Sequence, residues 1–575
     1  GWVAKNADVI SQDHTLRITA TGRQPFLANA NIGVAGPVQV RLRIRTAKNG
    51  EGRLQWRTKD QEGFPETGQR KSFLINGGEW RELAVPLNVK GQLRHLRLVL
   101  PAQEEPIDMD WIEIRSADEK VKAAKRWDFN TSTPSPSVRP TKQPNVILIL
   151  ADDLGYGELG CYGAPNVRTP HMDSLAAQGV RCTDGYAAFP VCSPSRAALL
   201  TGRYPARFGP TYEDYYGGGA PELDPIKHPT IAQMMKDAGY RTGCFGKWNV
   251  SNLNRRPAND FGFDRWVGLH LNHDFYTHKV VRTGELDMYE NGKKLKRAGI
   301  WSDTIFTNEA ISFIKAESWK PFFIYLPFQA PHTPIQDPDV PMDKPQEKNR
   351  QTLIKMIERL DHEIGRILQT LNDEKLIDNT LVILTSDNGG EQKIARNLPL
   401  SGAKQMLSEG GIRVPLILRW PVMLPAGQEF SMPISAMDLT ATIAAAAGVK
   451  PAPTKLFDGV DLVPALNGKI ELSYDRPLFF RRRNVSVRES RNAIRQSAVR
   501  KGDWKYLRTY RPVGSGKYQA ALYNLKKDIG EKKNVAAAYP EVAKGMRDLL
   551  GQWEHEMSKT AEPFPEVLPM KKTQK

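Results

Sequence analysis

Acidic and amide side chains directly follow two apolar runs of the chain. Asp152 and Asp153 come after the apolar residues 145–151, and Asp387 and Asn388 come, after one serine, at the end of a second run, Leu-Val-Ile-Leu-Thr. Continuous apolar runs are typical of strands buried on both faces of a sheet. Oxygen ligands from two such strand ends favour Ca²⁺ or Mg²⁺ over Zn²⁺, and irregular loop geometry favours Ca²⁺. These four residues are therefore predicted to hold a divalent metal, with Ca²⁺ expected before Mg²⁺.

A sulfur side chain is expected at the start of a helix within residues 191–203, Val-Cys-Ser-Pro-Ser-Arg-Ala-Ala-Leu-Leu-Thr-Gly-Arg. Ser193 is a suitable N-cap and Pro194 a suitable first helical residue, and the glycine near the end is a natural stop. Cys192 then lies just before the helix, where free N–H groups favour negative charge. Arg196, one turn into the helix, is expected to turn back toward the same point. A buried structural cysteine is the alternative for Cys192 taken alone.

The chain has 575 residues and a formal net charge of +17. This length suggests about two to four domains. An excess of positive charge attracts polyanions, and since no nucleic-acid-binding motif accompanies it, we expect an acidic polysaccharide partner and no nucleic acid; solubility is the alternative explanation. No apolar run approaches the ~20 residues needed to cross a bilayer, so no membrane span is expected. The four cysteines lack metal-finger spacing and predict no disulfide framework.

Residues 1–116 are predicted to form strands, because apolar and basic residues alternate, as in the stretch Val-Gln-Val-Arg-Leu-Arg-Ile-Arg. We expect an antiparallel β-sandwich of jelly-roll type, similar by pattern alone to carbohydrate-binding sandwiches. Trp2, Trp56 and Trp80 are candidate sugar platforms, but packing within the protein is the preferred interpretation. Lys-rich sequence followed by a Ser/Pro/Thr-rich stretch predicts a linker over residues 117–143.

From residue 144 buried strands alternate with helices, which predicts a large doubly wound, mainly parallel α/β sheet flanked by helices over residues 144–470. Helices are expected at residues 169–179, 230–239 and 351–371. Such sheets bind ligands at the carboxyl ends of their strands, where polar residues including Lys247 and His332 fall. An antiparallel-sheet subdomain with a final helix is expected over residues 471–560, and residues 561–575 are expected to be a tail.

The pattern Cys-x-Pro-Ser-Arg followed by Ala-Ala-Leu-Leu-Thr-Gly-Arg resembles the signature of the formylglycine-dependent (type I) sulfatases of the alkaline-phosphatase-like superfamily. In that family a formylglycine-generating maturation enzyme oxidises the cysteine to 3-oxoalanine (formylglycine). The hydrated aldehyde attacks sulfur, the alcohol leaves, and sulfate is then expelled. The metal ligands that the resemblance implies are Asp152, Asp153, Asp387, Asn388 and Cys192.

The resemblance also implies catalytic roles for Cys192 and for basic residues that follow expected strands. Arg196 matches the residue that holds the formylglycine and the charge beside the metal. Lys247, and Lys404 in Ser-Gly-Ala-Lys, match the lysines that contact the sulfate. His332, in Ala-Pro-His-Thr-Pro, matches the histidine near the leaving oxygen.

One position departs from the family pattern. The family commonly reads Gly-Lys-Trp-His, whereas here Gly-Lys-Trp is followed by Asn249. In relatives that histidine is thought to help to release sulfate, whereas an amide has no titratable proton at neutral pH and could orient a hydroxyl but not accept its proton. Three outcomes stay open: another base substitutes, sulfate release is slow, or the chain is a weakened homologue. His273, between His270 and His278 in a loop-like stretch, is nominated as a substrate contact or replacement base, with a solvated loop histidine as the alternative.

Together these features predict a metal-dependent sulfatase acting on a sulfated polysaccharide or its oligosaccharides. Arg481, Arg482, Arg483 and Arg488 either line a cleft for such a polyanion or face solvent. The alternatives are a phosphoester or phosphonate hydrolase of the same superfamily, and a weakly active protein that binds sulfated glycans. The chain opens with neither an initiator Met nor a signal peptide. With a signal peptide presumed removed, we expect a periplasmic or extracellular protein.

Overall fold

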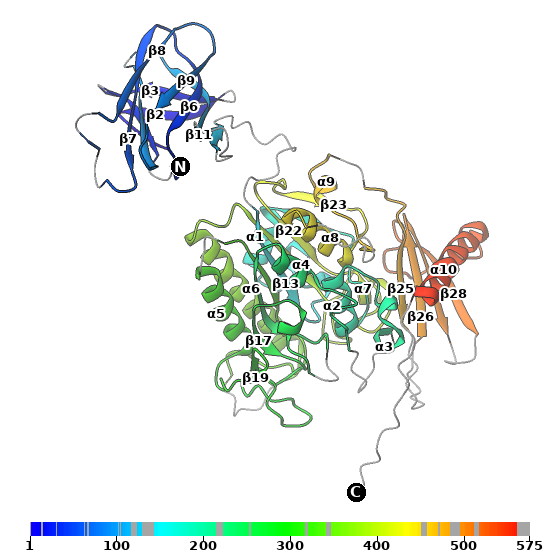
Figure 1. The fold of residues 1–575 in the computed structure, drawn as a ribbon. Helices are drawn as coiled ribbons and strands as arrows, with labels where there is room; N and C mark the ends of the chain where they lie inside the picture. The colour runs from blue at the N-terminus through cyan, green and yellow to red at the C-terminus, as the bar shows by residue number, and fades with distance from the viewer. Residues whose placement is uncertain are drawn as a thin grey trace. The chain divides into compact units, whose positions relative to one another are not determined.

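The computed structural model divides the chain into two compact units, Gly1–Val138 and Arg139–Lys575 (Figure 1). The structure describes residues 2–12, 15–22, 24–29, 32–61, 64–65, 68–101, 103, 105–116, 124–128, 143–213, 222–251, 255–316, 320–340, 347–449, 457–469, 472–482, 495–510 and 517–560. Among these residues every helix lies in the second unit, whereas the first unit contains strands only.

The N-terminal unit contains two six-stranded antiparallel sheets, ordered β1-β4-β10-β7-β8 with β5 beside β10, and β2-β3-β11-β6-β9 with β12 beside β11. The strands are β1 (Val3–Lys5), β2 (Ala7–Gln12), β3 (Thr15–Ala20), β4 (Phe26–Asn29), β5 (Val34–Ala35), β6 (Val38–Arg45), β7 (Gly50–Thr58), β8 (Arg70–Ile75), β9 (Arg81–Leu87), β10 (Gln92–Val99), β11 (Ile107–Ser116) and β12 (Ala124–Asp128). Apolar side chains from both sheets form one core. The alternation in β6 is typical, because Val38, Val40, Leu42 and Ile44 are buried while the residues between them are half-exposed.

The N-terminal unit extends beyond residue 116. Strand β12 pairs antiparallel with β11, in the register Ile112↔Trp127, so a strand lies in the segment expected to be a linker. Alternation is weak in these Lys-rich residues, which is why the sequence alone does not reveal the strand. The Ser/Pro-rich residues 129–142 lie outside the described part of the chain.

The three tryptophans considered as sugar platforms all pack within the N-terminal unit. Trp2 meets Trp127 edge to face, with ring centroids 5.4 Å apart. Trp56 is buried in the shared core. The Arg43 guanidinium lies 5.2 Å from the centre of the Trp80 ring, a cation–π distance.

A ten-stranded sheet forms the centre of the second unit, in the order β19-β18-β17-β16-β20-β13-β21-β22-β14-β23. Its strands are β13 (Asn145–Ala151), β14 (Val180–Cys182), β16 (Arg241–Lys247), β17 (Arg265–Leu269), β18 (Tyr289–Glu290), β19 (Lys293–Lys294), β20 (Phe322–Pro327), β21 (Thr380–Ser386), β22 (Leu416–Arg419) and β23 (Gln428–Phe430). From β17 to β21 the neighbours are parallel, whereas β18, β19 and β22 run antiparallel to theirs. The predicted α/β class is therefore confirmed, with a parallel centre and antiparallel pairs toward the edges. A parallel pair, β15 (Gly185–Tyr186) and β24 (Ile434–Ser435), lies apart from this sheet.

Helices cover both faces of the central sheet. In β13, Val146 and Leu148 point to the face covered by α2, α4 and α8, and Ile147 and Ile149 point to the face covered by α1, α5 and α6. The helices are α1 (Pro170–Ala177), α2 (Cys192–Thr201), α3 (Pro210–Glu213), α4 (Ile231–Asp237), α5 (Ser302–Lys315), α6 (Arg350–Asp373), α7 (Glu409–Ile412), α8 (Ala436–Ala447), α9 (Val463–Leu466) and α10 (Pro540–Thr560). Because successive strand residues point to opposite faces, an apolar run buries both.

Helix ends follow the sequence signals with one exception. The Asn349 side chain caps α6, and Gly202 ends α2 with a left-handed φ of 68°. Helix α2 begins at Cys192 after the N-cap residue Val191, so the expected N-cap at Ser193 is wrong. A proline is tolerated throughout the first turn, and the proline in this stretch therefore does not fix which residue precedes the helix. Cys192 consequently lies in the first turn of the helix rather than before it.

The C-terminal part of the second unit is an antiparallel sheet, β25-β26-β27-β28, that carries the long helix α10 (Figure 1). The strands are β25 (Leu478–Arg482), β26 (Arg495–Lys501), β27 (Trp504–Tyr510) and β28 (Tyr518–Asn524). Leu550, Trp553 and Met557 of α10 share a core with Val499 of β26 and with Ala198 of α2. This sheet and α10 thus share a hydrophobic core with the helix that begins at Cys192.

A buried ion network joins the C-terminal sheet to the loop of residues 401–409. Lys505 of β27 is fully buried, and its Nζ lies 2.8 Å from Glu409 Oε1 and 2.9 Å from Glu531 Oε1. Glu531 Oε2 accepts hydrogen bonds from Ser401 Oγ at 2.9 Å and from the Glu409 backbone N–H at 2.6 Å. The network therefore fixes both ends of this loop.

We predict that Lys505→Met lowers the free energy of unfolding of the second unit by about 3–5 kcal/mol, because two buried carboxylates lose their shared cation. Urea denaturation followed by tryptophan fluorescence measures the change. Lys501→Met is the matched control, since Lys501 is an exposed lysine at the end of β26. Equal denaturation midpoints for the two variants would contradict a stabilising role for the network.

Candidate active site and metal centre

Two pairs of ligand-type residues meet at the carboxyl ends of adjacent strands. Asp152 and Asp153 directly follow β13, and Asp387 and Asn388 directly follow β21. The strands are parallel neighbours whose last residues are paired, so both pairs emerge at the same sheet edge. Asp153 has a left-handed φ of 67°, and its N–H donates to Asp387 Oδ1 at 3.2 Å. The turn after β13 is therefore tied to the turn after β21.

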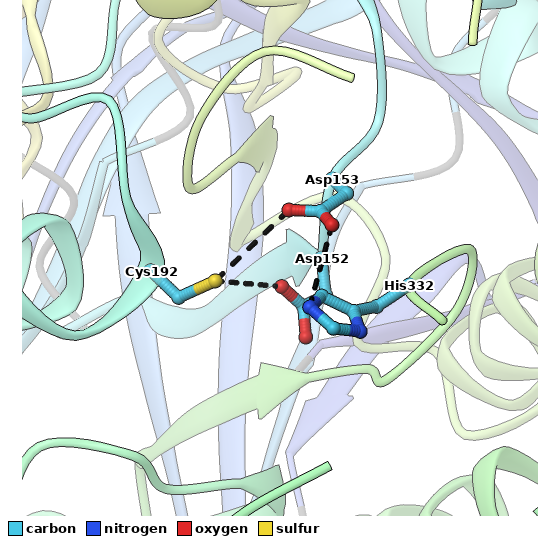
Figure 2. A group of neighbouring side chains, drawn as sticks. All are labelled: Asp152, Asp153, Cys192 and His332. Carbon is cyan, nitrogen blue, oxygen red and sulfur yellow. Dashed lines mark hydrogen bonds and ion pairs between the residues drawn. The ribbon is translucent and has the colours of Figure 1, made fainter. Parts of the chain in front are cut away.

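Cys192 points from the first turn of α2 toward the same carboxylates. Its Sγ lies 3.3 Å from Asp152 Oδ1 and 4.0 Å from Asp153 Oδ1. With His332, these residues form a buried group whose ligand atoms all lie within 4.8 Å of one another (Figure 2). Burial, and then the nearby carboxylate of Asp152, raise the pKa of the Cys192 thiol well above its ordinary value. The unmodified side chain is therefore a thiol that donates, not a thiolate.

Arg196 is the cation at the centre of this group. It lies one turn after Cys192 on the same face of α2 and is fully buried. Its Nε and Nη2 donate to Asp387 Oδ2 at 2.9 and 2.7 Å, and Nη1 donates to the Lys247 carbonyl at 2.7 Å. Nη2 also lies 3.4 Å from Asp152 Oδ1. Arg196 thus links the ends of three strands.

Two lysines complete the positive side of the site. Lys247, the last residue of β16, places Nζ 2.5 Å from Asp152 Oδ2, and Lys404 places Nζ 2.7 Å from the Asp153 carboxylate. Burial lowers the pKa of each lysine, but the facing carboxylates raise it by more, so both remain charged. Burial raises the pKa of Asp152, but Lys247 and the other cations outweigh it and hold that pKa well below its ordinary value.

His332 faces the group from the loop after β20. Its Nδ1 donates to the Thr333 carbonyl at 2.6 Å, which leaves Nε2 directed at Asp153 Oδ2, 3.4 Å away, and at Asn272 Nδ2, 2.9 Å away. Burial lowers the pKa of His332 to about 4, although Asp153 opposes the shift. The imidazole is therefore neutral near pH 7, with Nε2 as the nitrogen that faces the centre.

The donor set fits a hard divalent cation. Asn388 Nδ2 donates to Asp153 Oδ1 at 2.7 Å and to the Gly389 carbonyl at 2.9 Å, so the amide is held in one orientation. Its Oδ1 is buried and has no hydrogen-bond partner. A buried acceptor without a donor is costly, and a bound cation would satisfy it. The sulfur of Cys192 is the one soft donor in an otherwise hard set.

The two residues nominated around the missing family histidine are both buried. Asn249 has a left-handed φ of 49°, and its Nδ2 donates to the His270 carbonyl at 3.1 Å. His273 has no exposed surface, and its Nδ1 lies 3.1 Å from the Asp287 carbonyl. Its ring centre lies 5.3 Å from that of His278. The alternative of a solvated loop histidine at His273 is therefore wrong, because this loop folds back into the core.

Two of the four arginines considered as either cleft-lining or solvent-facing, Arg481 and Arg482, are buried and have structural partners. Arg481 donates to Glu213 from Nε at 2.6 Å and from Nη2 at 2.9 Å, and both side chains are buried. Arg482 is also buried and donates to the Gln405 carbonyl in the loop that carries Lys404. The other two arginines of the expected cluster, Arg483 and Arg488, lie outside the described residues.

Two residues of the site were missed from the sequence. Asn272 contacts His332, and its only sequence signal is its place beside the nominated His273. Asp303 of α5 accepts the N–H groups of Gln329 and Ala330, each at 3.0 Å, and so fixes the turn that leads to His332. From the sequence, an aspartate at the start of a helix is interpreted as an ordinary helix cap. The residues around Asp303 therefore give no sign of its contact with the distant turn.

The fold and this buried group of carboxylates, cations and cysteine define a hydrolase of the alkaline-phosphatase-like class. The family model described as Sulfatase matches residues 144–449, and the model described as N-sulphoglucosamine sulphohydrolase, C-terminal, matches residues 403–556. The chain therefore belongs to the sulfatase family and is a sulfuric ester hydrolase. Formylglycine and a divalent metal are the catalytic groups that this family implies.

Relatives and solved structures agree with this assignment. The chain is 34% identical to N-acetylgalactosamine-6-sulfatase of Sus scrofa over 64% of its own length and 74% of the relative. It is 31% identical to N-acetylgalactosamine-6-O-sulfatase of Bacteroides thetaiotaomicron over 71% of its own length and 93% of the relative. The crystal structure of Ps i-CgsB in complex with k-i-k-neocarrahexaose matches 74% of this chain and 96% of that one, with TM-score 0.65 and 30% identity.

The rival hydrolase function is not favoured by these comparisons. The phosphonate monoester hydrolase of Agrobacterium radiobacter matches with TM-score 0.55 and 22% identity, a likeness that shows the fold alone.

Within the described residues, no helix is both long enough and apolar enough to span a bilayer.

We predict that His273→Gln makes folding stability less sensitive to acid. Burial lowers the pKa of His273 from 6.5 to about 3, so between these values the unfolded chain binds a proton that the folded chain does not. The stability that depends on neutral His273 is therefore present above pH 6.5 and is lost as the pH falls. The variant should lose about 1.4 kcal/mol less per pH unit below pH 6. Urea denaturation at pH 7, 6 and 5 measures this, with exposed His362→Gln as control; parallel slopes for both variants would refute the prediction.

Proposed function

We propose that this sulfatase removes sulfate from a sulfated polysaccharide or its oligosaccharides, using a formylglycine made from Cys192 and a Ca²⁺ ion. One observation carries the proposal. Cys192 lies within reach of two strand-end carboxylates and one turn from a buried arginine. The names of the similar proteins, which include N-acetylgalactosamine-6-sulfatases and a complex with neocarrahexaose, support a carbohydrate substrate.

The metal would be held by Asp152, Asp153, Asp387, Asn388 and residue 192. Oxidation of Cys192 replaces the one sulfur donor by oxygen and makes the donor set uniformly hard, which suits Ca²⁺ on loop-borne ligands, with Mg²⁺ as the smaller alternative. When bound, the metal and the hydrated aldehyde supply a hydroxyl nucleophile near neutral pH. The unpartnered Oδ1 of Asn388 supports its place among the ligands.

The cations of the chain would bind and orient the sulfate. Lys247 places its ammonium group against Asp152 and Lys404 places its own against Asp153, and both stay charged in this buried setting. They would stabilise charge on the sulfate oxygens where little water screens them. Arg196 would keep Asp387 and Asp152 in place, and these carboxylates would in turn orient residue 192. His332 would direct Nε2 at the leaving oxygen. Because the single proton of the neutral ring is on Nδ1, Nε2 must first take up a proton before it can deliver one there.

Asn249 and His273 would support the site from the protein interior, without contacting the metal group. Both are buried, and Asn249 holds the backbone of the segment that carries Asn272, the neighbour of His332. We propose that Asn249 positions this segment relative to the substrate and that His273 supports it from the core. A replacement base at His273 would require the segment to open, because the side chain has no exposed surface.

For the N-terminal unit we propose a jelly-roll-like β-sandwich, supported by two antiparallel sheets around one core. We also propose a periplasmic or extracellular site of action, since polysaccharides are too large to cross a membrane unaided. The partners would be the sulfated glycan and a formylglycine-generating maturation enzyme that acts on Cys192.

We predict that Cys192→Ala lowers sulfate release by about 10⁴-fold or more, as expected for the loss of a nucleophile. The enzyme is co-expressed with a formylglycine-generating enzyme, residue 192 is checked by peptide mass, and sulfate release is measured on a panel of sulfated oligosaccharides. Full conversion with hydrolysis of phosphate esters but of no sulfate ester would overturn the proposal.

Lys404→Ala is expected to lower kcat by about 10²–10³-fold, because a charge aimed at the sulfate is lost in a buried site. Lys315→Ala is the matched control, since Lys315 is an exposed lysine at the far end of α5. Comparable losses for the two lysines would show that overall charge, rather than the position of Lys404, sets the rate.

Chelation is expected to lower both activity and the melting temperature, since a ligand that binds only the folded state stabilises it. EDTA, which removes both ions, followed by Ca²⁺ or Mg²⁺ add-back, with activity and thermal unfolding as readouts, identifies the metal. A melting temperature and activity unchanged after exhaustive chelation would exclude the proposed site.

A further inference from the structure

A hollow lies between the start of α6 and the loop of residues 394–398. Its volume is about 420 Å³, within the range of small-ligand sites. Arg350 and Arg396 line it, together with the amide side chains of Asn166 and Asn397. The wall therefore combines two guanidinium groups with neutral hydrogen-bonding groups.

The lining of this hollow is connected to the active site through the Gly390 carbonyl. Asn397 Nδ2 donates to the Gly390 carbonyl at 3.2 Å, and the same carbonyl accepts the Lys404 N–H at 3.1 Å. Gly157, four residues after Asp153, packs so closely on this loop that an added Cβ would meet the Leu398 carbonyl at 2.4 Å. The backbone that follows the catalytic strands thus contacts the loop that lines the hollow.

The two arginines of the hollow differ in charge balance. Arg350 donates to Glu158 through Nη1 and Nη2, each at 2.6 Å, so its charge is matched by a buried carboxylate. In the described part of the chain, the Arg396 side chain has neither an ion pair nor a hydrogen bond, and its Nε is buried without a partner. The backbone N–H of Arg396, as distinct from its side chain, donates to Glu158 Oε1 at 2.6 Å. One guanidinium charge of the hollow is therefore uncompensated.

The lining also offers apolar surface beside this charge. Leu398 is 57% exposed at the rim, and Pro165, Ile354 and Ile394 complete the wall. An anionic sugar has the matching chemistry, since its C–H faces pack on apolar groups and its charged substituent pairs with a guanidinium. A small inorganic anion would leave the apolar surface uncovered.

We propose that this hollow is a subsite for an anionic substituent, a sulfate ester or a carboxylate, on a sugar next to the one whose sulfate is hydrolysed. Arg396 is its specificity-determining residue. The proposal rests on the proposed glycan substrate, and it explains how a basic enzyme would prefer a polyanionic chain over an isolated sulfate ester. Arg350 serves to hold Glu158, which fixes the backbone of Arg396.

The test measures binding, independently of turnover. Protein carrying Cys192→Ala is titrated calorimetrically with a short dextran sulfate oligosaccharide and with inorganic sulfate, and the measurement is repeated with Arg396→Ala added. We expect the Kd for the oligosaccharide to rise about 10-fold or more when Arg396 is removed, as for loss of a charge-assisted hydrogen bond, and the Kd for inorganic sulfate to change much less. Arg396→Lys should recover part of the loss, because it keeps the charge but not the planar fork.

Lys315→Ala, in the same background, is the charge-matched control. Equal weakening by Lys315→Ala and Arg396→Ala would mean that oligosaccharide binding follows net charge, and would overturn the subsite. Unchanged oligosaccharide affinity in Arg396→Ala would overturn it as well. A polygalacturonate oligosaccharide, which carries carboxylates only, distinguishes the two anions: dependence on Arg396 for both probes assigns a general anion subsite, and dependence for dextran sulfate alone assigns a sulfate subsite. Because these readouts need no catalysis, they separate failure of the subsite from failure of the proposed hydrolysis.

Discussion

Buried carboxylates need buried cations, and this requirement organises the catalytic unit. Asp152, Asp153 and Asp387 are at most 2% exposed, and burying ionised groups without compensation costs several kcal/mol each. Compensation comes from Arg196 on α2 and from Lys247 on β16. The site therefore assembles only when a helix and several strands are in register, and its geometry depends on the packing of the whole central sheet.

The third cation is supplied differently, because Lys404 lies in a loop rather than on a strand or helix. A loop of this kind needs fixed ends and a fixed middle to present a lysine within hydrogen-bond distance of Asp153. The ion network around Lys505 fixes the ends, and Arg482 binds the Gln405 carbonyl in the middle. The C-terminal sheet is thus a structural part of the active site, although it adds no residue to the metal group.

Much of the site could be predicted because it lies at strand ends that the sequence marks clearly. The apolar runs before Asp152 and Asp387 show where buried strands stop, and parallel strands bring their ends together. The start of α2 was misplaced by two residues, since a proline marks the first turn without marking its first residue.

Residues whose role depends on a distant partner could not be predicted in the same way. Arg481 and His273 both appeared to be surface groups from local polarity, yet Glu213 pairs with the first and a folded-back loop covers the second. Lys505 stands in a strand that reads as basic, and its two carboxylate partners are far away in the sequence. A charged residue type shows that its side chain must contact either an oppositely charged group or water. It does not show which of these the fold provides.

The position of Glu531 and Lys505 also affects how the protein is made. Synthesis proceeds from the N-terminus, so a nascent chain that has emerged through α8 already carries Asp152, Arg196 and Asp387. It lacks Lys505 and Glu531, although Arg413, a second cation beside Glu409, is already present. The loop that carries Lys404 can reach its final conformation only after residue 531 has left the ribosome. A premature stop before codon 531 would therefore leave a chain without the carboxylate that holds both ends of the loop carrying Lys404.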